Sequence, residues 1–221
     1  MAKLFIVATP IGNLKDITLR ALEVLKEADF IVCEDTRHTK ILLDHYKIQK
    51  PLISYFQHSK LTKLSKIIEI IKSGKSIALV TDAGTPGIAD PGGLLVSRLT
   101  SQLDSEIEII PIPGANAAIA ALSISGFPTD EFVFYGFLPT KKGRQTKLKE
   151  ISKEKRVVVL YESPYRIKKL LNEILEFIGD REVVVCRELT KKFEEIYRGK
   201  ISEIIGKVKE KGEFVVVINK K

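Results

Sequence analysis

Apolar residues in the first half of the chain follow two periods. Short, mostly apolar runs predict buried strands, and they alternate with stretches whose apolar residues recur every three or four positions, as in amphipathic helices. The strands are expected at residues 3–8, 30–33, 77–81 and 107–112. The helices are expected at residues 14–28, from residue 36, at 61–71 and at 94–103, with Thr36 as the N-cap of the second helix and Gly74 after the third.

The second half repeats this alternation after a break at residues 111–114, where Pro-Ile-Pro-Gly favours a linker. Helices are expected at 117–123, in a basic segment after residue 141, at 163–178 with Ser163 and Pro164 as N-cap and first residue, and at 201–208. Strands are expected at 132–135, 156–161, 182–187 and 213–219. Such alternation predicts an α/β fold with two α/β domains, residues 1–112 and 113–221, and mostly parallel or mixed sheets.

Composition excludes several classes of protein. With 44% hydrophobic and 29% charged residues, the chain is not expected to be disordered, collagenous or coiled-coil. No apolar run approaches the roughly 20 residues of a membrane helix, and the apolar start is too short for a signal peptide. Cys33 and Cys186 lie in strand-like runs and are expected as reduced core residues of a cytoplasmic protein. No metal is expected, because the histidines share no ligand spacing: His38, His45 and His58.

Positive charge is concentrated in the second half of the chain. Residues 1–113 carry 14 basic and 13 acidic side chains, whereas residues 114–221 carry 22 and 15. Within residues 141–156 eight basic residues stand against two acidic ones. This segment predicts either a surface that binds a polyanion such as nucleic acid or a solvated lysine-rich helix face, and charge alone does not decide between them.

Three loops after predicted strands have the composition of ligand-binding loops: residues 9–13, 82–93 and 113–117. In open α/β sheets ligands bind beyond the carboxyl ends of strands, and glycine lets the backbone approach them closely. Residues 82–93 include four glycines and two prolines, which is unusual for a loop without a role, although a rigid crossover remains the alternative. For the other two loops, ordinary turn and cap chemistry is equally compatible. The chain has no G-x-G-x-x-G motif, no P-loop and no nucleophile elbow.

A polar cluster, Glu34-Asp35-Thr36-Arg37-His38, follows the second predicted strand. Its carboxylates could act as a general base, and Arg37 and His38 could hold a substrate. The alternative is the capped start of a helix, at which carboxylates suit the positive end. Similar groups at residues 161–166 and 186–191 fit surface caps or ion pairs as well as a site.

Six segments in this order resemble the tetrapyrrole methylase superfamily. They are VATPIGNLKDITLRALEVLKEADFIVCEDTRHT, VTDAGTPGIADPG, PIPGANAAIAALSISGFPTD, YGFLP, LYESPYR and CRELTK, and they span about residues 3–219. EDTRHT and DAGTPGIADPG are similar to the branch that methylates ribosomal RNA rather than to the porphyrin and corrin enzymes. Two departures are expected to matter: Thr9, Pro10 and Ile11 occupy a turn that is often richer in glycine, and longer relatives carry a C-terminal extension.

The resemblance implies a cytoplasmic homodimer that holds S-adenosylmethionine (SAM) in a cleft between two α/β domains. It implies methyl transfer to the ribose 2′-oxygen of a cytidine in the decoding region of 16S ribosomal RNA, with no membrane or DNA partner. The implied cofactor contacts are Pro10, Ile11, Gly12, Asp82, Ala83, Gly84, Thr85, Ile88, Asn116, Ala117 and Glu162.

For the chemistry, Asp35 or Glu34 is the hypothesised general base, and Arg37 and His38 are hypothesised to position the ribose or its phosphate. Lys141, Lys142 and Arg144 are expected to bind RNA. The alternatives are a SAM-dependent tetrapyrrole methyltransferase and a non-catalytic RNA-binding assembly factor.

Overall fold

The computed structural model describes residues 1–55, 61–103 and 106–220, so His58 lies outside the described residues. The chain divides into two compact units, residues 1–116 and 117–221, whereas the expected boundary lay at residues 112 and 113. Each unit has its own sheet and its own core, and each is described separately below.

The first unit is a five-stranded sheet in the order β3-β2-β4-β1-β5, and every neighbouring pair is parallel. Its strands are β1 (Ala2–Val7), β2 (Phe30–Cys33), β3 (Leu52–Ser54), β4 (Ile77–Leu79) and β5 (Ile107–Ile112). Its helices are the short 3-10 helix η1 (Leu14–Asp16) and α1 (Leu19–Glu27), α2 (Thr36–His45), α3 (Leu61–Lys72) and α4 (Gly92–Leu103).

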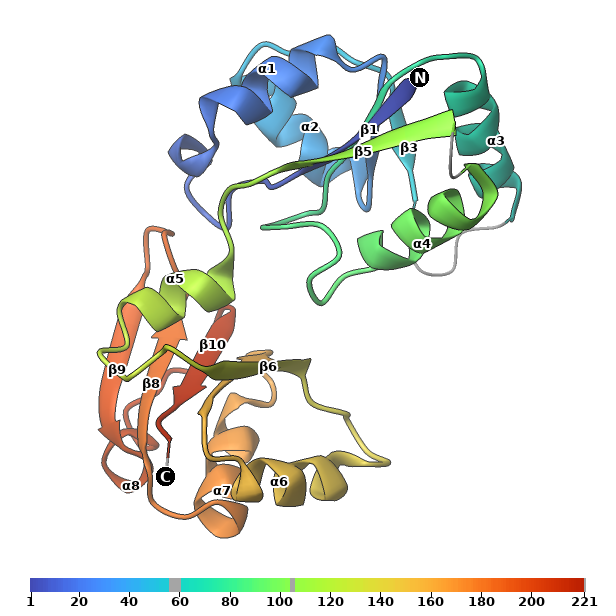
Figure 1. Cartoon of the computed structure of the whole chain (residues 1–221). Coiled ribbons are helices and arrows are strands. Elements are labelled where there is room, and N and C mark those ends of the chain that lie inside the picture. Colours follow the sequence, from blue (N-terminus) through green and yellow to red (C-terminus); the bar gives the residue numbers. More distant parts are fainter. Residues whose placement is uncertain (56–60, 104–105, 221) are drawn as a thin grey trace. The chain divides into compact units, whose positions relative to one another are not determined.

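Helices cover both faces of this sheet (Figure 1). On one face Phe5 and Val7 of β1 belong to a buried cluster with residues of α1 and α2, and on the other face Leu4 belongs to a cluster with residues of α3 and α4. The alternation of Leu4 and Phe5 follows from the two-residue period of a strand. Cys33 is buried in the first of these clusters, as predicted.

Two helix starts differ from the sequence prediction. The single helix expected over residues 14–28 is broken, because Ile17 is extended and Thr18 caps α1 by accepting a hydrogen bond from Ala21 N at 3.1 Å. The N-cap of α2 is Asp35 rather than Thr36, and its side chain accepts from Arg37 N at 2.8 Å. In both cases the capping oxygen satisfies a backbone donor of the first helical turn.

The second unit has a mixed five-stranded sheet in the order β6-β7-β10-β8-β9. Its strands are β6 (Phe132–Phe137), β7 (Val157–Glu162), β8 (Glu182–Arg187), β9 (Glu195–Lys200) and β10 (Phe214–Ile218). Its helices are α5 (Ala117–Ser123), α6 (Arg144–Lys153), α7 (Ile167–Phe177) and α8 (Ile201–Ile204). Strands β6 and β7 are parallel and the other pairs are antiparallel, so this sheet is mixed.

The core of the second unit also has two sides. Helix α5 packs on one face of the sheet with Cys186, and α6, α7 and α8 pack on the other (Figure 1). The prediction that Ser163 and Pro164 begin α7 is wrong: the helix begins at Ile167, and Arg166 N donates to Ser163 O in a preceding turn. Helix α8 ends at Ile204, earlier than expected.

Candidate functional site

The loops singled out in the sequence meet at one edge of the first sheet. Because the strands are parallel, the segments after β1, β2, β4 and β5 all leave from the carboxyl edge. Neighbouring strands β1 and β4 lead to helices on opposite faces of the sheet, α1 and α4 respectively. Such a point, where the winding of the chain reverses, is where open α/β sheets bind ligands.

Hydrogen bonds tie these loops to one another. Thr9 and Gly84 form a two-bond antiparallel bridge with N···O distances of 2.9 and 3.0 Å. The hydroxyl of Thr9 also donates to Thr81 O at 3.1 Å, and the hydroxyl of Thr85 donates to Ala115 O at 3.1 Å. The loops after β1, β4 and β5 are therefore held in fixed relation to one another before any ligand binds.

Two glycines permit this close approach. Gly84 has φ +84°, and a Cβ there would lie 3.4 Å from Ile11 Cγ2 and 3.7 Å from Ala115 O. At Gly114 a Cβ would lie 3.0 Å from Ala8 Cβ. At Gly84 the positive φ disfavours any other residue, although a Cβ would be in ordinary contact, whereas at Gly114 a Cβ would crowd Ala8.

The long loop after β4 is ordered by Asp90. One carboxylate oxygen of Asp90 accepts from Gly87 N at 2.8 Å and from Gly92 N at 2.6 Å. Ala89, between them, has φ +62°, an uncommon conformation for alanine. Sequence reasoning missed Asp90 as the organising residue of this loop. The loop leaves Ala83 and Ile88 exposed, whereas Pro10 and Ile11 of the first loop are buried.

Carboxylates gather beside this edge. Burial raises the pKa of Glu34 above its ordinary value of 4.5, and the neighbouring charges of Asp82, Asp90 and Asp35 raise it further. Asp82 also accepts a hydrogen bond from Asp35 N at 3.2 Å, which joins the segment after β2 to the loop after β4. Glu34 is thus a half-buried carboxylate that retains a proton more readily than an ordinary glutamate.

Asp35 has the opposite environment. The Arg37 side chain donates to its two oxygens at 3.1 and 2.7 Å, and this pairing lowers the pKa of Asp35 to about 2. The Arg37 side chain is 90% exposed, and His38 is exposed beside it. Asp35 therefore combines the helix cap, which was expected at Thr36, with an ion pair, and a carboxyl group with so low a pKa is a weak base.

The predicted site residues near and within the second unit have mixed surroundings. Asn116 and Ala117 lie at the start of α5, where Ala118 N donates to the hydroxyl of Tyr161 at 3.1 Å. The side chain of Glu162 is wholly enclosed and pairs with Arg166 at 2.7 Å and with Arg144 at 3.5 Å. Its Oε1 is bonded by Arg166 and by Ser163 N, whereas its buried Oε2 faces Arg144 without forming a hydrogen bond.

Arg144 is buried, contrary to the expectation from the sequence. It was expected on an RNA-binding surface, but its side chain is 4% exposed, pairs with Glu173 at 2.7 Å and donates to Pro139 O at 3.1 Å. The spacing of Arg144, Leu148 and Ile151 places it on the buried face of α6, a signal that was present in the sequence. Lys141 and Lys142 are exposed, as an RNA contact requires.

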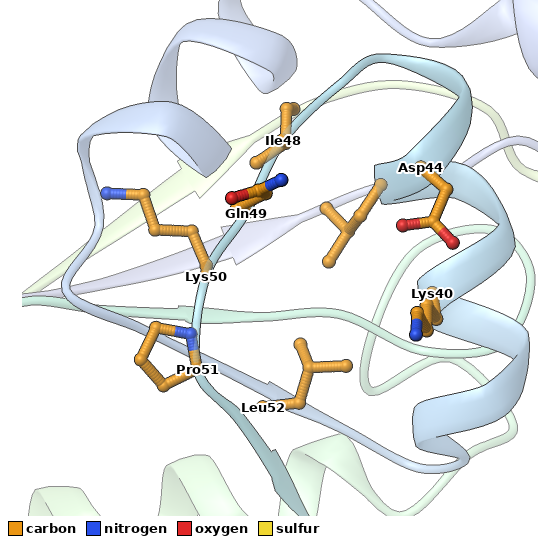
Figure 2. Close-up of a pocket in the computed structure, with 8 residues that line it drawn as sticks. Lys40, Asp44, Ile48, Gln49, Lys50, Pro51 and Leu52 are labelled. Carbon is orange, nitrogen blue, oxygen red and sulfur yellow. The ribbon is translucent and has the colours of Figure 1, made fainter.

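One further hollow lies elsewhere in the first unit. It is lined by Lys40 and Asp44 of α2 and by the segment that runs from Ile48 to Leu52 (Figure 2). Its volume is about 600 Å³. None of the predicted site residues lines it. Within residues 1–55, 61–103 and 106–220, no cluster of His, Cys, Asp or Glu could hold a metal ion. In the same ranges no helix is long and apolar enough to cross a membrane.

Comparison with known proteins gives a consistent result. The family model of tetrapyrrole (corrin/porphyrin) methylases matches residues 3–205. The chain is 47% identical to ribosomal RNA small subunit methyltransferase I of Thermotoga maritima over the whole of both chains. It is 49% identical to the protein of the same name from Bacillus subtilis, covering 99% of this chain and 75% of the relative.

A solved structure shows the same fold at low sequence identity. Uroporphyrin-III C-methyltransferase of Thermus thermophilus, in complex with S-adenosyl homocysteine, superposes with a TM-score of 0.69 at 18% identity. The match covers 99% of this chain and 97% of that chain. At this identity the likeness establishes the fold alone.

Proposed function

The chain belongs to the tetrapyrrole (corrin/porphyrin) methylase family, and we propose that it is a SAM-dependent methyltransferase of small-subunit ribosomal RNA. The observation that carries the proposal is 47% identity over full length to a protein named ribosomal RNA small subunit methyltransferase I. We further propose the ribose 2′-oxygen of a cytidine in the decoding region of 16S rRNA as the acceptor. A ribosomal substrate fits a cytoplasmic protein, and the family resemblance favours a homodimer.

The edge of the first sheet fits SAM in two respects. Its loops are fixed by the Thr9–Gly84 bridge and leave backbone exposed at Gly12 and Ala83, where a cofactor's polar groups can be bound. Its carboxylates, Asp82 and Asp90 among them, suit a ligand with a positive sulfonium. When bound, SAM supplies the methyl group.

The proposed cofactor contacts fall into three groups. Exposed or half-buried residues can touch the ligand directly, and they are Gly12, Asp82, Ala83, Thr85, Ile88, Asn116 and Ala117. Pro10, Ile11 and Gly84 are buried and are proposed to shape the backbone beneath it. The enclosed carboxylate of Glu162 is left with a positioning role.

Between the two hypothesised bases, the surroundings favour Glu34. A base works best when its pKa approaches the working pH, and the pKa of Glu34 is raised whereas that of Asp35 is about 2. We propose that Glu34 accepts the proton of the ribose hydroxyl; bound SAM would supply the methyl group to that oxygen, with its sulfur leaving as a neutral thioether. Asp35 holds Arg37, and Arg37 and His38 are proposed to contact the ribose or a neighbouring phosphate.

The experiment is transfer of labelled methyl from SAM to purified small ribosomal subunits that lack the modification, followed by mapping of the labelled nucleotide. Label on a decoding-region ribose is the expected result. Label on a base or on another region would overturn the proposed acceptor. SAM binding without transfer to subunits, but with transfer to a tetrapyrrole such as a precorrin, would establish the alternative enzyme. Subunit binding with no SAM binding would indicate a non-catalytic RNA-binding factor.

A further inference from the structure

Tyr165 is the most exposed large apolar or aromatic side chain among the described residues, at 94% of its surface. It lies in the turn between β7 and α7, within the segment Tyr-Glu-Ser-Pro-Tyr-Arg. A single exposed aromatic residue needs no explanation by itself, because surfaces carry many apolar atoms. The turn that presents Tyr165 is what separates it from an ordinary surface residue.

That turn is fixed on both sides of Tyr165. Before it, Ser163 N donates to Glu162 Oε1 at 2.8 Å. After it, Arg166 pairs with Glu162 at 2.7 Å and donates to Ser163 Oγ at 3.2 Å. The enclosed Glu162 therefore holds both ends of a short turn whose middle residue points its ring into solvent.

The same buried group fixes a neighbouring loop. Strands β6 and β7 are parallel, so the segments that follow them leave from one edge of the sheet. Arg166 donates to Leu138 O at 3.3 Å, and Arg144, paired with Glu162, donates to Pro139 O at 3.1 Å. The loop tied down in this way carries the exposed Lys141 and Lys142. A buried ion pair is weak evidence for stability, and we assign this network a positioning role because it ties both loops.

We infer that Tyr165 is a stacking platform for an unpaired base of the substrate RNA, with Lys141 and Lys142 holding adjacent phosphates. The inference rests on the proposed function. Proteins recognise RNA largely by stacking splayed bases on aromatic rings and by neutralising phosphates beside them. Tyrosine suits this role because its ring loses little conformational freedom on binding, and the Glu162 network limits that loss further.

The test compares three variants of Tyr165 in the full chain: Tyr165→Ala, Tyr165→Leu and Tyr165→Phe. The probe is the purified small subunit lacking the modification. Loss of one stacked base raises Kd and KM for the subunit by about 5- to 150-fold for Tyr165→Ala. Tyr165→Phe keeps the ring and is expected to retain wild-type affinity, whereas Tyr165→Leu is expected to behave like Ala. SAM affinity and thermal unfolding stay unchanged in all three.

The lysines have a matched control within the same segment. Lys141→Ala/Lys142→Ala is expected to reduce the slope of log Kd against log salt by about 1.4, because each phosphate of a single strand that a lysine neutralises adds about 0.7 to that slope. Lys153→Ala/Lys155→Ala removes the same charge from exposed positions before β7, at the opposite edge of the sheet, and should leave the slope unchanged.

The outcomes separate the two proposals. If the wild-type chain methylates subunits but Tyr165→Ala binds them equally well, the stacking inference is overturned and the proposed function stands. If Tyr165→Leu matches Tyr165→Phe, the contact is apolar packing and stacking is again excluded. If the wild-type chain neither binds nor methylates subunits, the proposed function fails and this inference fails with it.

Discussion

Glu34 and Glu162 stand at comparable places in the two units but have opposite surroundings. Glu34 directly follows β2, and Glu162 is the last residue of β7. Glu34 lies half-buried near the carboxylates of Asp82 and Asp90, which oppose its ionisation. Glu162 is wholly enclosed between Arg144 and Arg166. The first environment prepares a carboxylate to exchange a proton, whereas the second commits a carboxylate to holding its neighbours in place.

The loops of the two units are held by correspondingly different bonds. In the first unit the loops are held by main-chain bonds, as in the Thr9–Gly84 bridge, and by bonds from the main chain to the carboxylates of Asp82 and Asp90. In the second unit the buried Arg144 and the partly exposed Arg166 donate to the carbonyls of Pro139 and Leu138 respectively. We therefore propose that the chemistry belongs to the first edge and that the second edge presents surface groups.

The largest effect is expected at Glu34. Glu34→Gln should lower the rate of methyl transfer by about 10²- to 10⁴-fold, the usual contribution of a general base, with SAM affinity retained. Only the ionised form accepts a proton, so the wild-type rate should fall as the pH drops through the raised pKa, which lies above 4.5. The measurement is single-turnover transfer against pH. Asp35→Asn is the control, because asparagine still caps α2, and it should keep the acid limb. A wild-type rate for Glu34→Gln would remove Glu34 from the mechanism.

The second effect is expected on stability rather than rate. Glu162→Ala removes the carboxylate partner of the partly exposed Arg166 and leaves Arg144 paired with Glu173 alone, so it should lower the free energy of unfolding by about 1–3 kcal/mol, measured by urea denaturation. Glu150→Ala is the control, since Glu150 forms an exposed pair with Lys147, and it should cost less than about 1 kcal/mol. Equal losses for the two variants would contradict the contrast between an enclosed and an exposed carboxylate.

The sequence predicted most of the elements because their apolar periods are clear, and it missed two strands for one reason. β3 and β9 are edge strands, as are β5 and β6, but unlike those two they are very short or rich in charge. β3 has three residues, and β9 reads Glu-Ile-Tyr-Arg-Gly-Lys. Edge strands bury little and are often short or charged, so the pairing of their backbones leaves a weak pattern of apolar residues.

The loops that form the candidate edge could be located from the sequence, whereas the contacts within that edge could not. Strand ends and glycines located the loops, but the contrast between Glu34 and Asp35 depends on Asp82 and Asp90, which are brought close only by the fold. The pairing of Arg144 with Glu173 is likewise a tertiary contact between α6 and α7. The sequence shows which residues are charged but not whether a partner distant in the chain neutralises that charge.

A third and smaller effect is expected from substitutions of glycine at and away from the carboxyl edge of the first sheet. Gly84→Ala and Gly74→Ala each place alanine at a positive φ, of +84° and +81°, and each should cost about 1–2 kcal/mol of stability. Nothing lies within 4 Å of the Cβ that would be added at Gly74, whereas at Gly84 Ile11 and Ala115 are in contact. Calorimetry should therefore show weaker SAM binding for Gly84→Ala only. Equal SAM affinities for Gly84→Ala and Gly74→Ala would show that the Thr9–Gly84 bridge does not contribute to cofactor binding.

The smallest effect is expected from a type of ion pair that occurs in each unit. Asp35 with Arg37 and Glu154 with Arg156 are exposed pairs two residues apart, and each carboxyl pKa is lowered to about 2. A carboxyl group whose pKa is lowered in the folded state stabilises that state at any pH above the ordinary pKa of the group. This contribution is lost as the pH falls towards 2. Arg37→Ala and Arg156→Ala should each raise the pKa of the partner carboxyl, measured by carboxyl-carbon NMR titration, while activity at neutral pH depends only on Arg37. A pKa that stays near 2 after either substitution would show that backbone donors alone hold that carboxylate. Equal shifts in both units would confine the difference between the two edges to Glu34 and Glu162, where burial decides what a carboxylate does.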